Sequence, residues 1–397
     1  MKPDDFKDPR TGRLVQIGND HWAFVPADLP PNISWTDELV SRLSLAERSV
    51  GTLTGLCRWL PNTQLFAQAF LNREAVLSSR MEGASATLSD IFAHKIAPKS
   101  ATKLSADTTE EVYNYALALE HGLDRLKHLP ISRRLLCEVH RVLLDGVRGQ
   151  EHAPGRFRTN QNMIGNRGDT PRSARFVPPP PGEELENVLD KLESYINNPT
   201  GLPILVDLAL IHYQFETIHP FADGNGRIGR LLLTLLLISR GVLAAPFLYL
   251  SAFFERNRTE YQRRLLDVSQ RGNWTRWIDF FLQAIIEEAD DAIARASSLQ
   301  SLREEYRRRA QAISGPRSIL TAIDYSFVEP VFSVGTLRRI IARSAADTRA
   351  VLRQLVEMGV VVEKTGKQRN QVFVAEQVLA ILEAPTTESP MQPASGD

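Results

Sequence analysis

The feature that most restricts how this 397-residue chain can fold is a glycine-broken loop between two apolar segments. Residues 203–217 carry apolar side chains at spacings of four and three, and residues 227–240 contain a run of leucines, so both segments predict buried helices. The loop and the helix start that follows it read His219-Pro220-Phe221-Ala222-Asp223-Gly224-Asn225-Gly226-Arg227-Ile228-Gly229-Arg230. Glycines allow a tight turn there. We therefore predict two helices joined by a loop in which polar side chains gather.

Three glycines of this segment also spell the dinucleotide-binding pattern GxGxxG. That pattern requires a strand before it and an acidic residue about 20 positions after it. The preceding segment is helical instead, and no carboxylate occurs between Arg230 and Glu255. We reject a dinucleotide-binding fold.

The remaining residues of the loop are typical of phosphate-transfer chemistry. A helix N-terminus offers unsatisfied amides to an anion, and Arg227 and Arg230 are three positions apart on that helix. Asp223 supplies a hard oxygen suited to Mg²⁺, and His219 can act as a general base near neutral pH. Together these residues predict a site for a metal-bound polyphosphate.

The segment matches every fixed position of the signature HxFx(D/E)GNGRxxR, so the chain resembles the Fic/DOC family over roughly residues 100–295. The resemblance implies a mainly α fold: a Fic-type helical core with a small β-hairpin flap. It also implies protein AMPylation, in which AMP passes from ATP to a Tyr, Thr or Ser hydroxyl of a target protein and pyrophosphate leaves. DOC-type kinases depart from this signature in the Gly-Asn-Gly-Arg portion. Transfer of another nucleotide, or of phosphocholine, stays open.

The resemblance also assigns roles to single residues. His219 would deprotonate the target hydroxyl, and Asp223 would hold Mg²⁺ between the α- and β-phosphates. The phosphates would be bound by Asn225, by the amides of Gly224 and Gly226, and by Arg227 and Arg230. Phe221 is expected to point into the core. Tyr261 is a candidate wall for the adenine, with a core aromatic residue as the alternative.

Upstream, Ser78-Ser79-Arg80-Met81-Glu82-Gly83 matches the family's inhibitory pattern (S/T)xxxE(G/N), at the end of a predicted helix over about 64–83. The resemblance implies that Glu82 pairs with Arg230 and so blocks the productive pose of the γ-phosphate. The same Glu82 could instead orient water for removal of AMP.

Residues 162–181 contain two short extended runs and predict a surface hairpin. This hairpin resembles the family's flap, on which a target would dock by β-augmentation; an ordinary exposed loop is the alternative.

Residues 317–383 predict a separate winged helix-turn-helix, because helical patterns over 334–342 and 345–358 precede two short extended runs around a polar turn. Its helices and turn are basic at Arg338, Arg339, Arg343, Arg349, Arg353, Lys364, Lys367 and Arg369. Such a module could contact DNA or dock a protein, and both interpretations stay open. We predict this order: an N-terminal extension (1–100), the catalytic core (101–297), a helical linker (298–316), the winged helix (317–383) and a disordered tail (384–397).

Composition narrows the function classes. Basic and acidic residues number 47 each, which argues against a chain dominated by attraction to nucleic acid or anionic membrane. The longest apolar run, 231–238, is too short to span a membrane. Cys57 and Cys137 show no metal-binding or disulfide spacing, so we expect a cytoplasmic protein. The leading hypothesis is an autoinhibited adenylyltransferase; a nucleotide-sensing DNA-binding regulator is the alternative, and a homodimer is allowed.

Overall fold

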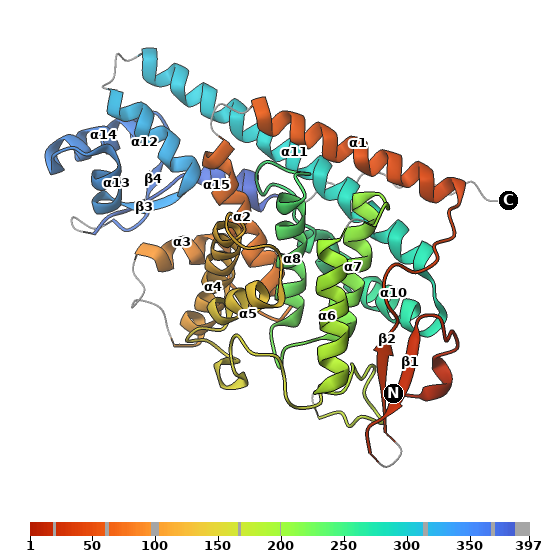
Figure 1. Cartoon of the computed structure of the whole chain (residues 1–397). Helices are drawn as coiled ribbons and strands as arrows, with labels where there is room; N and C mark the ends of the chain where they lie inside the picture. The colour runs from red at the N-terminus through yellow and green to blue at the C-terminus, as the bar shows by residue number, and fades with distance from the viewer. Residues whose placement is uncertain are drawn as a thin grey trace. The chain divides into compact units, whose positions relative to one another are not determined.

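A computed structural model describes residues 1–18, 21–59, 63–96, 103–165, 168–198, 200–312, 317–366 and 370–385. The fold is mainly helical, with two small antiparallel sheets (Figure 1). The helices are α1 (Asp37–Trp59), α2 (Thr63–Arg80), α3 (Leu88–Ile96), α4 (Lys103–Arg125), α5 (Arg133–Leu143), α6 (Glu183–Asn197), α7 (Ile204–Ile218), α8 (Asn225–Ser239), α9 (Ser251–Arg256), α10 (Arg258–Arg271), α11 (Trp274–Ala312), α12 (Arg317–Val328), α13 (Val334–Ile341), α14 (Ala345–Glu357) and α15 (Glu376–Glu383). The strands are β1 (Gly12–Gln16), β2 (Trp22–Pro26), β3 (Val331–Ser333), β4 (Val362–Glu363) and β5 (Val372–Val374).

The chain separates into two compact units, each assembled from segments that are distant in sequence. The first unit comprises Met1–Gly51, Asn114–Leu243 and Tyr249–Ile286. The second unit comprises Thr52–Tyr113, Ala244–Leu248 and Glu287–Asp397. The predicted domains are consecutive stretches of the chain, whereas each of these units combines three segments that are separate in the sequence.

The core of the first unit is built on α7 and α8, which pack side by side (Figure 1). Almost every residue of both helices is buried, as their apolar sequences require. Gly229 lies where the helices meet, because a Cβ there would approach the Phe215 ring to 3.2 Å. The hairpin β1–β2 belongs to the same unit, with Leu14 opposite Phe24.

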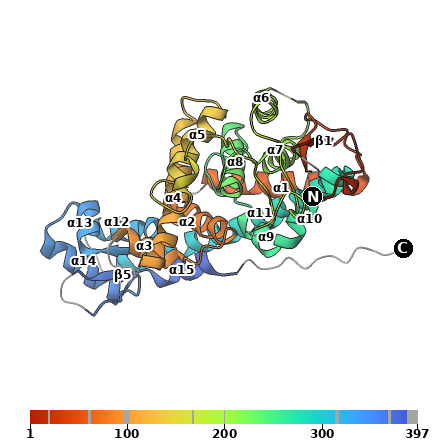
Figure 2. The same ribbon diagram turned by 90° about the horizontal axis from the view of Figure 1, so that it is seen from below.

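The second unit packs its C-terminal elements onto α2. Helix α12 lies against α2, and the Phe66 and Phe327 rings meet edge to face at 5.9 Å. The small sheet has the order β3-β5-β4 and is antiparallel throughout. Figure 2 shows α12, α13 and α14 gathered beside β5.

The predicted helices next to the loop and near the C-terminus are confirmed within a few residues, as α7, α8, α13 and α14. The sequence analysis misses β1, α3 and α9. The predicted helical linker at 298–316 is helical as far as Ala312, as the end of α11 and not as a separate helix, and its role as a linker stays a prediction. Some predicted features lie outside the described residues: the end of the linker at 313–316, the polar-turn residues Lys367 and Arg369, and the tail beyond Pro385.

Candidate active site

The predicted loop joins the end of α7 to the start of α8. His219 caps α7 with φ 50°, a left-handed conformation that is uncommon for a residue with a Cβ. Gly224 caps α8 with φ 76°, where glycine adopts this conformation without strain. Left-handed residues bound the loop on both sides, and such strain in a non-glycine residue often marks a functional site.

The ring of His219 has a defined orientation. Its Nδ1 lies 3.3 Å from the carbonyl oxygen of Glu216, and because a carbonyl can only accept, Nδ1 carries the proton. The lone pair is therefore on Nε2, and the half-buried ring can take up a proton there. This tautomer is the one that a general base needs.

Asn225 closes the loop through its side chain. Its Oδ1 accepts from the Phe221 amide and its Nδ2 donates to the Phe221 carbonyl, each at 2.8 Å. The structure thus gives this side chain a positioning role within the loop, and its predicted phosphate contact stays a prediction. The expectation for Phe221 is confirmed: its ring is fully buried and stacks on His140 at 3.9 Å.

Asp223 is half-buried and points one carboxylate oxygen back at the helix start. Its Oδ1 accepts from the Gly224 amide at 2.7 Å. Its Oδ2 lies beside Gly149, where an added Cβ would be only 2.6 Å away. The missing side chain of Gly149 therefore leaves the space that this carboxylate occupies.

Arg227 and Arg230 are both buried at the start of α8. No acidic residue lies in the first turn of this helix, so its amides, its dipole and the two guanidinium groups contribute positive charge there, while the Glu216 carboxylate of α7 lies beside Gly229. Burial, together with the positive charge of the two arginines, lowers the pKa of two histidines nearby. Burial lowers the pKa of His140 to about 4, with a further contribution from Arg227. Burial likewise lowers the pKa of His212 to about 3, helped by Arg230.

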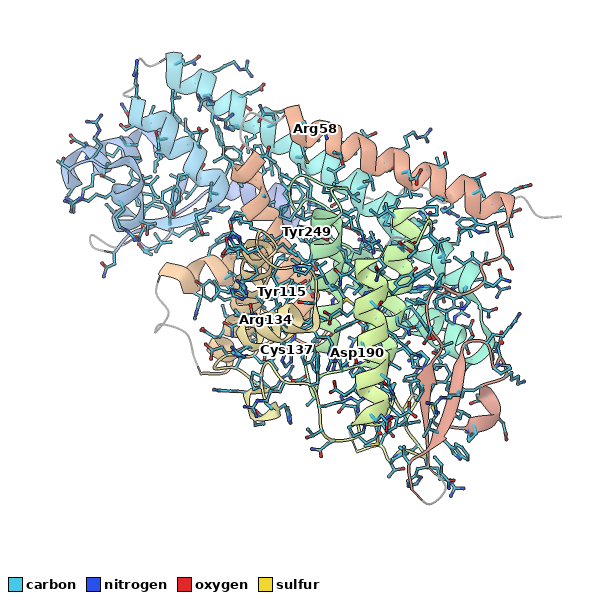
Figure 3. All side chains as sticks on the ribbon, in the orientation of Figure 1. Arg58, Tyr115, Arg134, Cys137, Asp190 and Tyr249 are labelled. Carbon is cyan, nitrogen blue, oxygen red and sulfur yellow. The ribbon has the colours of Figure 1, made fainter. Side chains whose placement is uncertain are left out.

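The structure adds His140, which the sequence analysis misses. His140 lies on α5, which Arg133 ties to Asp190 and Glu186 of α6 through ion pairs; Figure 3 labels Asp190 on α6. Its Nδ1 accepts from the Gly155 amide at 2.9 Å, so its Nε2 carries the proton and donates to the Asp223 carbonyl at 3.0 Å. His140, which is not part of the loop, thus fixes the loop backbone at Asp223.

A second residue that the sequence analysis misses is Arg158. It is buried, and its guanidinium donates only to backbone carbonyls. Its acceptors are the carbonyls of His219 (2.9 Å), Asn160 (3.2 Å), Pro179 (2.5 Å) and Ile218 (3.4 Å). Burial lowers its pKa to about 10, which leaves it charged at neutral pH. One side chain thereby joins the strained end of α7 to the segment that follows Asn160.

That segment is the predicted hairpin. Ile164 and Phe176 exchange both backbone hydrogen bonds as an antiparallel bridge, which confirms the two extended runs. Asn162 donates to the Phe221 carbonyl at 2.7 Å, and the Phe24 amide of β2 donates to the Val177 carbonyl at 2.9 Å. The hairpin is therefore fixed to the loop on one side and to β2 on the other.

Tyr261 lies in an aromatic cluster of the first unit. Its ring stacks on Phe254 at 4.5 Å, and its hydroxyl lies 2.9 Å from Nε2 of His212. It is buried. This environment favours the core alternative for Tyr261, and its contact with adenine stays a prediction.

The inhibitory pattern falls in the second unit. Ser78 is buried in α2, which ends at Arg80, and Glu82 is exposed in the turn that follows. Gly83 has φ 94°, as expected of a residue that ends a helix. The predicted ion pair between Glu82 and Arg230 would join the two units and stays a prediction.

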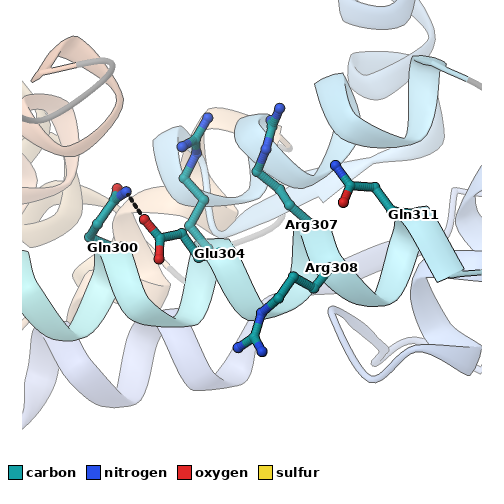
Figure 4. Close-up of a pocket in the computed structure, with 6 residues that line it drawn as sticks. Gln300, Glu304, Arg307, Arg308 and Gln311 are labelled. Carbon is teal, nitrogen blue, oxygen red and sulfur yellow. Dashed lines mark hydrogen bonds between the residues drawn. The ribbon is translucent and has the colours of Figure 1, made fainter.

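A hollow of about 460 Å³ lies elsewhere, along α11 in the second unit (Figure 4). It is lined by Gln300, Arg303, Glu304, Arg307, Arg308 and Gln311. Because none of these residues belongs to the loop, this hollow is not the predicted site.

Among the described residues, no cluster of three His, Cys, Asp or Glu side chains could hold a metal. None of the helices in the described ranges combines the length and apolar character needed to cross a membrane.

Comparison with known proteins finds two matching family models. Residues 130–237 match the Fic/DOC family, and residues 40–124 match the Fic/DOC family N-terminal domain. A probable protein adenylyltransferase of Aquifex aeolicus is 28% identical over 163 residues, covering 41% of this chain and 43% of the relative. The protein adenylyltransferase Fic of Drosophila virilis is 34% identical over 140 residues, covering 34% and 26%. The chain thus spans less than half the length of either relative.

Solved structures share the fold. A Fic family protein from Desulfovibrio desulfuricans superposes with a TM-score of 0.55 at 20% identity, covering 87% of this chain and 98% of that one. A Fic domain containing signaling protein from Bacteroides thetaiotaomicron gives 0.50 at 18% identity, covering 64% and 97%. The loop from His219 to Arg230 falls within the matched Fic/DOC region. Residues 40–124 and 130–237 thus belong to the Fic/DOC family.

Proposed function

We propose that this protein is a protein adenylyltransferase, which transfers AMP from ATP to the hydroxyl group of a Tyr, Thr or Ser side chain in a target protein. The observation that carries the proposal is the tautomer of His219, whose Nε2 lone pair lies at the end of a loop with a positive helix start. The curated relatives named protein adenylyltransferase support the same activity.

The reaction follows from these residues. The target hydroxyl gives its proton to Nε2 of His219 as its oxygen attacks the α-phosphorus. The bond between the α-phosphorus and the bridging oxygen breaks, and pyrophosphate leaves with the bonding electrons. Arg227, Arg230 and the first amides of α8 stabilise the charge on the phosphates. Asn225, His140 and Arg158 hold the loop in shape, so that most of the catalytic effect comes from positioning.

Asp223 fits a magnesium ion that arrives with the nucleotide. A single carboxylate, with no cluster of acidic side chains among the described residues, suits Mg²⁺, which is commonly bound by one or two carboxylates and by substrate phosphates. When bound, the ion would neutralise phosphate charge. Asp223 is held for this role by the Gly224 amide and by the space beside Gly149.

We also propose that Glu82 inhibits the enzyme by pairing with Arg230 and so excluding the γ-phosphate. Supporting this, Glu82 is exposed in a turn directly after α2, and Gly83 fixes the direction of the chain. Ser78, one turn earlier, is buried and anchors the end of the helix. For the target, we propose docking on the 162–181 hairpin, where Met163 is exposed next to the Ile164–Phe176 bridge.

The test is incubation with ATP labelled on the α-phosphate and Mg²⁺, following label on the protein and on lysate proteins. We expect weak labelling by the native chain, strong labelling by Glu82→Gly, and none by His219→Ala. Glu82→Gln is the matched variant, because it removes the charge while keeping the backbone preference of a side chain.

Each result has a clear interpretation. Labelling by His219→Ala equal to that of the native chain would overturn the catalytic assignment. Equal labelling by the native, Glu82→Gln and Glu82→Gly proteins would overturn the inhibition but leave the transferase activity. If Glu82→Gln loses the ability to remove AMP from a labelled target, Glu82 orients water instead.

A further inference from the structure

Two helices of the second unit present a face that the proposed transfer chemistry does not use. α13 and α14 are joined by the three residues Ala342–Ser344, with Ala342 in the left-handed conformation at φ 51°. Ser333 and Ser344 cap the two helices by accepting from amides three residues on, each at 3.1 Å. Capping at both starts and a short turn between them define a fixed helix–turn–helix.

The outward face of α14 is narrow and carries small side chains and arginines. Thr348, Val351, Leu352 and Leu355 are buried against α12 and α13. The opposite face, one turn after another, consists of Ala346, Arg349, Ala350 and Arg353. Because the other residues of this face are alanines, a partner can approach the helix closely.

Positive charge is concentrated on these two helices and their turn. Within residues 333–357, five exposed arginines stand against two carboxylates, a net charge of +3 in a chain whose total is zero. The arginines are Arg338, Arg339, Arg343, Arg349 and Arg353. In the part of the chain that the structure describes, none of the five has an ion-pair, hydrogen-bond or ring partner.

The neighbouring acids are otherwise engaged. Asp347, on α14 itself, accepts from the Ser344 hydroxyl at 2.8 Å. Asp324 is clamped by Arg303 and Arg307 of α11, and Glu376 pairs with Lys364. The second carboxylate of the segment, Glu357, is exposed at the last position of α14, one turn after Arg353. Among the described residues, these acids do not form ion pairs with the five arginines, so the face keeps a net positive charge.

We propose that this face binds double-stranded DNA, with α14 in the major groove and the arginines of α13 and of the turn on the phosphate backbone. A groove about 12 Å wide admits an α-helix, and an Arg on its outward face can reach the O6 and N7 of guanine. The centre of a protein interface usually combines arginine with aromatic or large apolar anchors. Here alanine and arginine occupy the centre, and the exposed Ile340 and Val356 lie singly at its edges.

The energetic consequence is a dependence on salt. Each phosphate neutralised by an arginine releases counterions, so binding weakens with a log–log slope of about −0.9 per contact. The three arginines of α13 and of the turn would therefore lower the affinity about 40-fold for a fourfold rise in salt concentration.

The experiment measures fluorescence anisotropy of a labelled duplex of about 25 base pairs with the full-length protein, over a series of salt concentrations. The test variant is Arg349→Ala/Arg353→Ala. The matched control is Arg58→Ala/Arg134→Ala, which removes the same charge from exposed positions on α1 and α5 (Figure 3). Thermal unfolding checks that each variant folds. A polyglutamate peptide is used as a competitor that represents an acidic protein partner.

We expect native protein and control to bind the duplex with roughly micromolar affinity at low salt, and the test variant to bind at least about tenfold more weakly because it loses the contacts to base edges. The proposal is overturned if the native chain does not bind duplex at low salt, or if both double variants lose affinity equally. Tighter binding of polyglutamate than of duplex would also overturn it and assign the face to an acidic protein. None of these outcomes depends on whether the protein transfers AMP.

Discussion

At the scale of single residues, the loop is defined as much by what lies behind it as by its own sequence. His140 is 79 positions before His219, and Arg158 is 61 positions before it, yet both hold the backbone of the loop. Neither belongs to the family signature, and no periodic pattern marks them as different from other polar residues. The residues that face a substrate could be predicted, because a base, a carboxylate and two arginines at this spacing are the residue types that phosphate-transfer chemistry requires. The residues that support them could not, because only the fold brings them together.

Gly149 allows a direct test of how Asp223 is placed. Its φ is 94°, and a Cβ added there would lie only 2.6 Å from Asp223 Oδ2, so alanine would both strain the backbone and displace the carboxylate. Gly146 also has a positive φ, 68°, but has open space around it. We expect both Gly→Ala changes to cost about 1–2 kcal/mol of unfolding free energy.

Only Gly149→Ala should raise the Mg²⁺ concentration needed for half-maximal labelling, by several-fold, provided the chain transfers AMP as proposed. Metal titrations of the labelling rate with the three proteins measure this. Coinciding titration curves for Gly149→Ala and Gly146→Ala would show that the position of Asp223 does not set the metal requirement.

His212 should make the protein sensitive to acid. Burial and Arg230 lower its pKa to about 3 in the folded state, whereas an unfolded histidine titrates near 6.5. Because the folded pKa is the lower one, the stability is fully present above about pH 6.5 and is lost as the pH falls toward 3. The expected slope is about 1.4 kcal/mol per pH unit in that range.

His212→Gln removes the titration and keeps a donor to the Tyr261 hydroxyl. Urea unfolding at several pH values compares the two proteins, and His140 cancels because both retain it. Between pH 6.5 and pH 5, the native chain should lose about 2 kcal/mol more than the variant. Parallel stability curves would mean that His212 is not held neutral by its surroundings.

At the scale of elements, the helices follow the sequence closely where apolar spacing is strong, and the differences have local causes. The dense charge after Leu299 predicts a helical linker, and the structure shows this stretch as the end of α11. Pairs one turn apart, Gln300 with Glu304 and Glu305 with Arg309, support the helix there. The short α9 and β1 carry too few residues to show a period. Two predicted helices and two extended runs near the C-terminus are found as α13, α14, β4 and β5, while the winged-helix assignment itself stays a prediction.

Arg158 links the hairpin to the end of α7, and its replacement should loosen both. A lysine has a single ammonium group and cannot serve the four carbonyls that the planar guanidinium reaches. Buried carbonyls left without donors make Arg158→Lys cost about 2–4 kcal/mol of unfolding free energy. Arg175→Lys is the control, because Arg175 lies in the same hairpin but is exposed and donates to one side chain, Gln262.

Hydrogen exchange measures the effect by region. In Arg158→Lys we expect faster exchange at the Ile164 and Phe176 amides and at His219, with α6 unchanged. Faster exchange spread evenly over the first unit would point to a general loss of stability and contradict a link between these two elements.

At the scale of the whole molecule, the even balance of charge hides an uneven distribution. The 47 basic and 47 acidic residues sum to zero, but residues 333–357 carry +3, so the rest of the chain carries −3. The total charge describes only the average. Whether a positive face exists depends on which arginines the fold leaves without partners, and that is visible only in the structure.

This distribution predicts association between copies that weakens with salt. A protein with no net charge lacks the general repulsion that keeps molecules apart, and the α13–α14 face of one copy can approach the acidic remainder of another. Sedimentation velocity should show a larger average mass at low salt than at about 0.3 M, where the screening length falls to roughly 5–6 Å. Arg349→Ala/Arg353→Ala should reduce the low-salt association, while Arg58→Ala/Arg134→Ala should reduce it less. A dimer whose population does not change with salt or with either double variant would instead indicate an apolar interface, and the charge distribution would then have no part in assembly.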